Sequence, residues 1–300
     1  MNYVEFCWID SHDTFKGALQ ELLGCSGQLL KKNFSSKELQ FSVKPRSISR
    51  ISLDVVNNKR VNPIYEGPPA RVIAVRDDYI IVHKPANLHS HPHDYSDKNT
   101  VLNFLSQENY NECIQVNVEN YDRGLIYRLD FETSGIMIVA KNDNFYQKMR
   151  NNFSSEVKSK FYLAVVTGKF NQEGFHSHGL KASGEKGSKQ KVVDRDAPND
   201  GVGDLEVKLV AYENGKSLVL VNLHSGLRHQ IRAQLSHLGF PILGDTLYGG
   251  TESTRLFLHA YRYEFGVTEE DTNADLFDSF FDLNSCFEMC HNMFGLFKRR

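Results

Sequence analysis

Short apolar runs recur between polar turns along the chain, and they constrain its fold more than any other feature. Segments rich in β-branched and aromatic residues are typical of strands; they lie at 71–84 (two strands joined at Asp77-Asp78), 136–140, 161–167, 206–212 and 217–223. Helical spacing of apolar residues is confined to 13–34, 100–105, 143–152 and 229–238. Because strands outnumber helices and alternate with them irregularly, the pattern predicts an α+β fold with a mostly antiparallel sheet.

A Pro/Gly-rich stretch, NPIYEGPPA at 62–70, predicts a domain boundary. We expect residues 1–70 to form an N-terminal extension, with two short helices separated at Gly24 and Gly27 and short strands between 39 and 61. Residues 71–300 then form the larger domain, with a polar loop or hairpin at 181–203.

The composition favours a cytoplasmic protein. The five cysteines are scattered, which suits reduced thiols better than a disulfide framework. The first residues, MNYVEFCWIDSHD, lack the basic and apolar regions of a secretory leader, and no apolar window reaches the roughly 18 residues that a membrane helix needs.

Net charge is -2, but the charges are segregated along the chain. Basic residues predominate between Lys31 and Arg60 and again between Lys181 and Arg195, whereas acidic residues gather at 269–282. A basic face attracts phosphate, so a nucleic-acid partner is one interpretation; ordinary solvated surfaces are the other.

One carboxylate stands at the entrance to an apolar strand, in the segment YRLDFETSG. Asp130 follows Arg128 and precedes Thr133 and Ser134. An aspartate on such a loop can act as a nucleophile or general base if donors, such as Thr133 and Ser134, and a cationic partner keep it ionised. It can equally cap the backbone of a turn.

Two further segments carry candidate functional residues. In HSGLRHQIRAQLSHLGFPILGDTLYGG (224–250), Arg228 and Arg232 lie four residues apart and would share one helix face, where an arginine could hold a carboxylate by two hydrogen bonds. In KFYLAVVTG (160–168), the ring of Tyr162 could stack on a nucleobase or fill the core.

Together, YRLDFETSG, KFYLAVVTG and LRHQIRAQLSHLGFPILGDTLYG resemble, in order and spacing, the H-R-L-D-x-x-T-S-G, K-x-Y-x-A-x-V-x-G and R-x-H-Q-I-R…G-D-x-x-Y-G segments of the RluA-type pseudouridine synthases. HKPANLHSHP and Leu258-His259-Ala260 are similar to further motifs of that family. The resemblance runs from about residue 71 to 265.

The resemblance implies a bent, mostly antiparallel central sheet flanked by helices and loops, with an active-site cleft across it. It also implies isomerisation of uridines in structured RNA, without cofactor or metal. Asp130 would be the catalytic aspartate, Arg232 its ion-pair partner, and Tyr162 the ring that packs on the target base. Residues expected to contact substrate are Arg128, which would help displace the base, and Tyr127, Arg228, Gln230, Ile231, Lys160, Thr133, Lys84 and His91.

The chain departs from the family pattern at three places: Tyr127 replaces a histidine, Leu227 an arginine and Gln234 a histidine. These differences bear on base flipping and target choice. The N-terminal extension resembles a small S4-type RNA-binding module in pattern alone, and a plain structural extension fits it as well.

Other functions compete with this interpretation. His89, His91 and His93 would share one face of a strand and suggest a metallohydrolase, as Cys286, Cys290 and His291 do less strongly. A non-catalytic RNA-binding relative is the nearer alternative, but both Asp130 and Arg232 are retained. We expect ribosomal RNA rather than tRNA as the partner, no membrane association, and a monomer.

Overall fold

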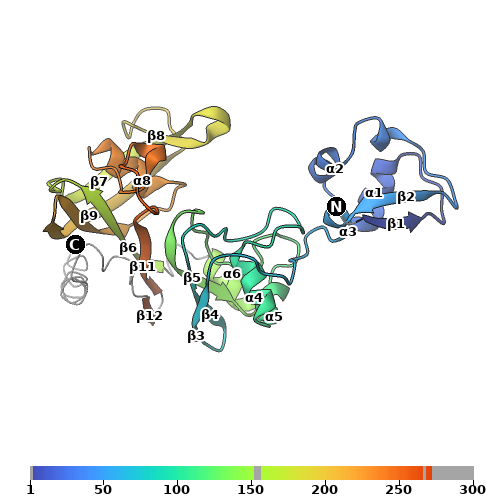
Figure 1. Cartoon of the computed structure of the whole chain (residues 1–300), viewed down its shortest axis with the longest axis horizontal. Helices are drawn as coiled ribbons and strands as arrows, with labels where there is room; N and C mark the ends of the chain where they lie inside the picture. The colour runs from blue at the N-terminus through green and yellow to red at the C-terminus, as the bar shows by residue number, and fades with distance from the viewer. Residues whose placement is uncertain (1–2, 152–156, 266–267, 272–300) are drawn as a thin grey trace. The chain divides into compact units, whose positions relative to one another are not determined.

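A computed structural model describes residues 3–151, 157–265 and 268–271 (Figure 1). The chain divides into two compact units, Met1–Gly67 with His91–Arg123, and Pro68–Ser90 with Gly124–Arg300. The first division falls within the Pro/Gly-rich stretch, but residues 91–123 group with the N-terminal residues. One reason is Asn103, whose buried amide donates to the carbonyl of Asn62 at 2.8 Å. The two units are discontinuous in sequence, so the domain limits expected from the sequence, 1–70 and 71–300, remain predictions.

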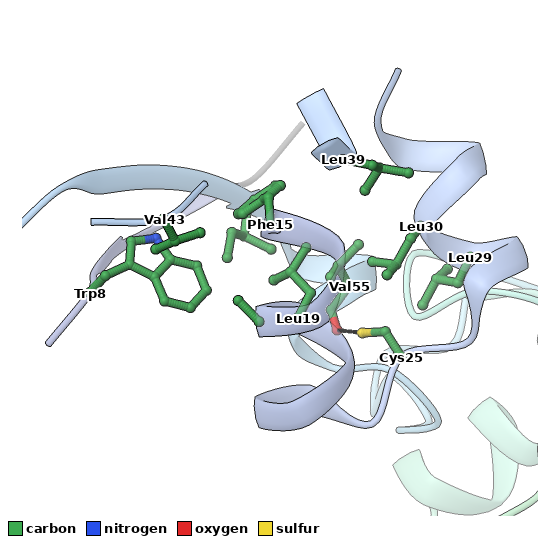
Figure 2. Close-up of a cluster of buried hydrophobic side chains, with 11 residues drawn as sticks. Trp8, Phe15, Leu19, Cys25, Leu29, Leu30, Leu39, Val43 and Val55 are labelled. Atoms are coloured by element: carbon green, nitrogen blue, oxygen red, sulfur yellow. Dashed lines mark hydrogen bonds between the residues drawn. The ribbon is translucent and has the colours of Figure 1, made fainter. Parts of the chain in front are cut away.

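The first unit is built around a small apolar core. Its elements are β1 (Tyr3–Cys7), α1 (Phe15–Leu23), α2 (Gly27–Asn33), η1 (Glu38–Gln40), β2 (Ile48–Ser52), α3 (Leu53–Val56), α4 (Val101–Gln107) and α5 (Asn111–Gln115). Figure 2 shows the core side chains, with Leu19, Leu30 and Val55 packed between the helices. The thiol of Cys25 donates to the carbonyl of Val55 at 3.6 Å, which fastens α3 to the turn between the first two helices.

The two expected helices of this unit are present. Thr14 caps the start of α1 by accepting from Gly17 N, and Gly24 ends it in the left-handed conformation (φ 62°). Gly27, expected to be a second break, is instead the first residue of α2, because Ser26 caps that helix by accepting from Leu29 N. The strands expected between 39 and 61 are wrong except for β2, since η1 and α3 are helical; β2 pairs antiparallel with β1.

The second unit contains one large sheet. Its elements are β3 (Arg71–Val75), β4 (Tyr79–Lys84), β5 (Ser134–Ala140), α6 (Asp143–Asn151), β6 (Val157–Thr167), β7 (Gly174–Ser183), η2 (Glu185–Gly187), β8 (Lys189–Val193), β9 (Gly201–Glu213), β10 (Lys216–Leu223), α8 (Gln230–His237), η3 (Thr246–Tyr248), β11 (Leu258–Phe265) and β12 (Thr268–Asp271). The polar stretch 181–203 is mostly a β-hairpin, in which β7 pairs with β8.

The strand order is β3-β4-β5-β11-β6-β10-β9-β7-β8, with β12 paired to β11. All described pairings are antiparallel except the short parallel contact of β5 with β11. In Figure 1, β11 lies between β5 and β6 and so joins the two halves of the sheet. The expected α+β fold with a mostly antiparallel sheet is therefore confirmed.

The junction between the halves requires a glycine. Gly135 pairs with Ala260 across the parallel contact and has φ 128°. A Cβ there would lie 2.2 Å from the carbonyl oxygen of Ala260, so only glycine lets the two strands approach this closely. The residues that precede β5 therefore lie next to the middle of the sheet.

Within the described residues, no helix is both long and apolar enough to cross a membrane. The proposed thiol-histidine group Cys286, Cys290 and His291 lies outside the described residues.

Candidate active site

Asp130 lies on a loop that is fastened on both sides. The hydroxyl of Ser90 donates to the carbonyl of Leu129 at 3.0 Å and accepts from its amide at 3.2 Å. The carbonyl of Phe131 accepts from the amide of Leu88 at 3.2 Å. The carbonyl of Asp130 accepts from the amide of Thr133 at 3.1 Å, which closes a turn before β5. The backbone around Asp130 is thus held while its side chain stays 29% exposed.

Lys84 provides a second anchor for the same loop. Its side chain is fully buried, and its ammonium donates to the carbonyls of Pro85, Leu88 and Phe131 at 3.1, 2.7 and 3.0 Å. Burial lowers the pKa of Lys84 to about 7, and the attraction of Asp130 opposes this shift. Expected as a substrate contact, Lys84 here ties the loop after β4 to the loop of Asp130.

Arg232 lies at the centre of a group of carboxylates. Its Nε and Nη2 donate to the two oxygens of Asp245, each at 2.8 Å, and both side chains are buried. Its Nη1 lies 3.4 Å from Glu132 and 3.7 Å from the Oδ2 of Asp130. Burial alone would lower the pKa of Arg232, but Asp245 and then Glu132 and Asp130 raise it, so the guanidinium stays charged.

The ion pair between Asp130 and Arg232 is therefore present, but its geometry differs from the expected one. The two parallel hydrogen bonds go to Asp245, and Asp130 faces the remaining nitrogen at a longer distance. Arg232 is oriented by Asp245 and presents its other edge to Asp130 and Glu132.

His229 approaches Asp130 from the other side. Its Nε2 lies 3.8 Å from the Oδ2 of Asp130, and its Nδ1 lies 3.0 Å from the hydroxyl of Tyr248. The guanidinium of Arg232 lies over the Tyr248 ring, 5.4 Å from its centroid. Burial lowers the pKa of His229.

Tyr162 belongs to a group of three tyrosines. Its hydroxyl lies 2.8 Å from that of Tyr263, and the rings of Tyr263 and Tyr127 are stacked in parallel with centroids 4.4 Å apart. The hydroxyl of Tyr127 donates to the carbonyl of Ile136 at 3.1 Å. Burial, with a contribution from the charge of Asp130, raises the pKa of Tyr162 to about 12. Tyr127, which replaces the family's histidine, thus packs as part of an aromatic stack.

The hydroxyl of Ser134 contacts His259 and Arg255 rather than Asp130. It lies 2.8 Å from the Nδ1 of His259 and accepts from Arg255 at 2.6 Å. The sequence makes Ser134 and Thr133 candidate donors to Asp130; the hydroxyl of Ser134 is instead used at the β5–β11 contact, and Thr133 contributes through its backbone amide.

Arg228 and Arg232 do not share a helix face. α8 begins at Gln230, and His229 before it is in the left-handed conformation (φ 53°), so Arg228 lies in the preceding loop. Its guanidinium donates to the carbonyls of Gly187 and Ser188 in the β7–β8 connection. Arg228 precedes α8 by two residues, so the helical spacing assumed between Arg228 and Arg232 does not apply.

The other expected substrate contacts are distributed as follows. Gln230 is buried and its amide bonds to Ser225, Leu227 and Asp204; Ile231 is buried at the start of α8.

Lys160 is buried, its ammonium donates to the carbonyl of Ser225, and burial lowers its pKa to about 8. Arg128 is exposed. His91 groups with the first unit, where its Nδ1 lies 3.0 Å from the carbonyl of Pro92.

Four residues near Asp130 were missed from the sequence: Glu132, His229, Asp245 and Tyr248. Three of them lie inside the quoted segment 224–250, so its H-Q-I-R and G-D-x-x-Y-G patterns already contained them. In the part of the chain that the structure describes, no group of three or more His, Cys, Asp or Glu residues is arranged to hold a metal ion.

Sequence comparison matches the part of the chain that contains Asp130, Tyr162 and Arg232 to a known family. The family described as RNA pseudouridylate synthase matches residues 78–237. Ribosomal large subunit pseudouridine synthase D of Borreliella burgdorferi is 31% identical over 204 residues, which cover 66% of this chain and 62% of that protein. The Pseudomonas aeruginosa protein of the same name is 31% identical over 180 residues, covering 59% of this chain and 53% of the relative. The chain thus spans less than two thirds of the length of these relatives.

Among solved structures, Human RNA Pseudouridylate Synthase Domain Containing 1 is similar with a TM-score of 0.54 and 22% identity. The similarity covers 73% of this chain and 87% of that one. It supports the fold.

Proposed function

We propose that this chain, which belongs to the RNA pseudouridylate synthase family, isomerises uridines in RNA to pseudouridine with Asp130 as the catalytic carboxylate. The observation that carries the proposal is the setting of Asp130. Its carboxylate remains partly exposed on a fastened loop, while the buried, charged Arg232 and the ring of His229 flank one of its oxygens. A carboxylate held this way lies beside a fixed positive charge and stays accessible to a substrate.

The conversion of uridine to pseudouridine requires one bond to the sugar to break and another to form. The bond between uridine N1 and the sugar C1′ breaks, the uracil turns and C5 bonds to C1′. C5 then loses its proton and N1 gains one, so that the product is an isomer of the substrate. The carboxylate of Asp130 can attack the sugar carbon or take a proton from the sugar, and both routes use one of its oxygens. The residues proposed here need no metal or redox cofactor for either route.

The uracil needs a surface to lie on after it leaves the RNA stack. Tyr162 is proposed for that role because its ring is fixed through Tyr263 and lies close enough to Asp130 for the carboxylate's charge to affect its hydroxyl. Arg128, exposed two residues before Asp130, is proposed to displace the base from its stack. Flipping costs a few kcal/mol, which phosphate contacts can offset.

We propose ribosomal RNA as the substrate in preference to tRNA, because two relatives at 31% identity are named as large ribosomal subunit enzymes. The exposed lysines of the first unit and of the β7–β8 hairpin would contact phosphate, and residues 1–70 would serve as an RNA-binding extension. We further propose a monomer that acts in the cytoplasm. A non-catalytic RNA-binding protein of the same fold is the competing function.

The proposal is tested with purified chain, unmodified large-subunit ribosomal RNA transcribed in vitro, and an unmodified tRNA pool. Pseudouridine is mapped in each by carbodiimide modification and primer extension. We expect specific sites in the ribosomal RNA with the natural chain and none with Asp130→Asn, while both proteins bind the RNA alike. Binding without product from the natural chain would favour the non-catalytic alternative, and equal product from the variant would remove Asp130 from the mechanism.

A further inference from the structure

His229 occupies an unusual backbone position next to the site. It has φ 53°, in the left-handed region that non-glycine residues adopt uncommonly and in which asparagine, aspartate and histidine are enriched. It stands immediately before α8, and its carbonyl accepts the helix hydrogen bond from Ala233 at 2.9 Å. His229 is therefore the cap residue between the loop and α8, and its backbone position is set by both.

The two ring nitrogens of His229 connect two different groups. Nδ1 lies 3.0 Å from the hydroxyl of Tyr248, and Nε2 lies 3.8 Å from the Oδ2 of Asp130. The His229 side chain is only 11% exposed, so its ring is held within the site.

Tyr248 is itself held by a donor. Its oxygen accepts from the backbone amide of Gln190 in β8 at 2.8 Å, and its own carbonyl accepts from the hydroxyl of Ser236 at 2.7 Å. Because the Gln190 amide can only donate, the phenolic proton of Tyr248 is available for the Nδ1 of His229.

The protonation of His229 follows from its surroundings. Burial lowers its pKa, and Arg232 and Arg228 lower it further, while Asp130 and Glu132 oppose them. A neutral imidazole carries one proton, and the nitrogen that accepts a hydrogen bond is the one without it. If Nδ1 accepts from Tyr248, the proton lies on Nε2 and faces the carboxylate.

We propose that His229 is a positioning residue that orients the carboxylate of Asp130 through its Nε2 proton, and that the hydroxyl of Tyr248 selects this tautomer. The inference deepens the proposed function and rests on the role of Asp130 in it. Arg232 cannot orient Asp130 alone, because both parallel hydrogen bonds of its guanidinium go to Asp245. A neutral donor on the other side restricts the carboxylate without adding charge. Catalytic hydrogen bonds are often long in an unliganded site and tighten once substrate binds, which is the change expected for the 3.8 Å contact.

The chain of contacts also reaches the basic hairpin. Gln190 lies between Lys189 and Lys191 in β8, and its amide holds Tyr248. Arg228, next to His229, donates to the carbonyls of Gly187 and Ser188 in the same connection. The element proposed to bind phosphate therefore supports the residue that orients Asp130.

Two substitutions separate positioning from folding. His229→Asn keeps a residue that tolerates the left-handed backbone, but its amide is too short to bridge Tyr248 and Asp130. Tyr248→Phe keeps the ring under Arg232 and removes only the hydroxyl. Matched controls are His176→Asn in β7 and Tyr212→Phe in β9, whose side chains are not part of the proposed site.

Kinetics on the ribosomal RNA transcript give the first readout. We expect kcat to fall about 10- to 100-fold in both variants with KM within about 2-fold of the natural value, since a misplaced catalytic group costs rate rather than binding. His229→Gln, whose longer amide can still donate to Asp130, should recover part of the lost kcat. Controls should match the natural chain. Unchanged kcat in Tyr248→Phe would overturn the proposal.

Nitrogen-15 NMR of the histidine rings at pH 7.5 gives a second readout that needs no activity. The expected spectrum shows His229 protonated on Nε2 in the natural chain and a mixture of tautomers in Tyr248→Phe. Protonation on Nδ1 in the natural chain would overturn the proposal. This readout uses no RNA. If the chain makes no pseudouridine, the proposed function is contradicted, but the spectrum still determines the tautomer of His229.

Discussion

Arg232 donates two parallel hydrogen bonds to Asp245, each 2.8 Å long, while Asp130 lies 3.7 Å from its remaining nitrogen. Asp245 therefore fixes the plane of the guanidinium, and Asp130 lies beside a cation that is already oriented. Because Asp245 bears the hydrogen bonds, the carboxylate of Asp130 keeps lone pairs for a substrate.

Replacing Asp245 should therefore damage the fold as well as the site. Asp245→Asn leaves the buried charge of Arg232 without its main partner, which typically costs about 3–5 kcal/mol of unfolding free energy. Urea unfolding measures the loss. Glu5→Gln, in the exposed pair with Arg50, is the control and should change the free energy by less than about 1 kcal/mol. An equally small effect of Asp245→Asn would show that the pair is dispensable.

The ring of Tyr162 should matter more than its hydroxyl. Tyr162→Phe leaves the hydroxyl of Tyr263 without this partner, so a loss of about 1 kcal/mol in stability and no more than about a tenfold loss in kcat are expected. Tyr162→Leu removes the stacking surface, worth about 1–3 kcal/mol per base, and should lower kcat/KM about 5- to 150-fold. Single-turnover assays on the RNA transcript compare them. Equal activity of the two variants would argue against stacking.

Lys84 should be required to hold the loop of Asp130. Lys84→Met keeps most of the buried stem but leaves three carbonyl oxygens without this donor. The carbonyl of Phe131 still accepts from the amide of Leu88. Each buried acceptor that is left without a partner costs about 1–3 kcal/mol, so unfolding free energy and activity should both fall. Lys169→Met, at an exposed position after β6, is the control. A stable Lys84→Met protein with full activity would contradict the anchoring role.

The same lysine predicts a pH dependence of stability. Burial lowers the pKa of Lys84 from 10.5 to about 7 in the folded protein. Between these values the unfolded chain binds the proton and the folded chain releases it, so the contribution of Lys84 to stability rises with pH, by up to about 1.4 kcal/mol per unit. Below pH 7 both states are protonated and this dependence disappears. The unfolding free energy of the natural chain minus that of Lys84→Met should therefore increase from pH 7 to 10. A difference that stays constant over this range would contradict the lowered pKa of Lys84.

Basic residues of the first unit should contribute to RNA affinity through charge. Lys31, Lys37 and Lys44 are exposed, so replacing all three by alanine should weaken binding to ribosomal and unrelated RNA alike. The slope of log affinity against log salt should become shallower by about 0.7–0.9 for each phosphate that the variant no longer neutralises. Filter binding at several salt concentrations measures this. An unchanged slope would assign RNA binding to other surfaces.

The family and the general architecture could be predicted from local sequence. Strand runs such as 136–140 and 217–223 contain the β-branched residues that a buried sheet needs, and they appear as β5 and β10. The fixed order of the Asp130, Tyr162 and Arg232 segments indicated the family, which the match over 78–237 supports. The end of α1 at Gly24 could be predicted for the same reason, since this glycine acts on neighbouring residues alone.

Contacts between distant residues could not be predicted in this way. The grouping of residues 91–123 with the first unit depends on bonds such as that from Asn103 to Asn62. The place of Arg228 depends on a single left-handed residue, His229, which shifts the helix start and changes which side chains share a face. A pattern that assumes regular spacing fails wherever one backbone angle departs from it.

The sequence by itself determined which residues are available: a carboxylate before a buried strand, an arginine on a later helix, and a tyrosine in a strand between them. Only the tertiary structure decided how they pair, because Asp245, Glu132 and Asp130 all compete for one guanidinium. The choice depends on distances and on burial, which favours the fully enclosed Asp245 as the bidentate partner and leaves Asp130 partly exposed between Arg232 and His229.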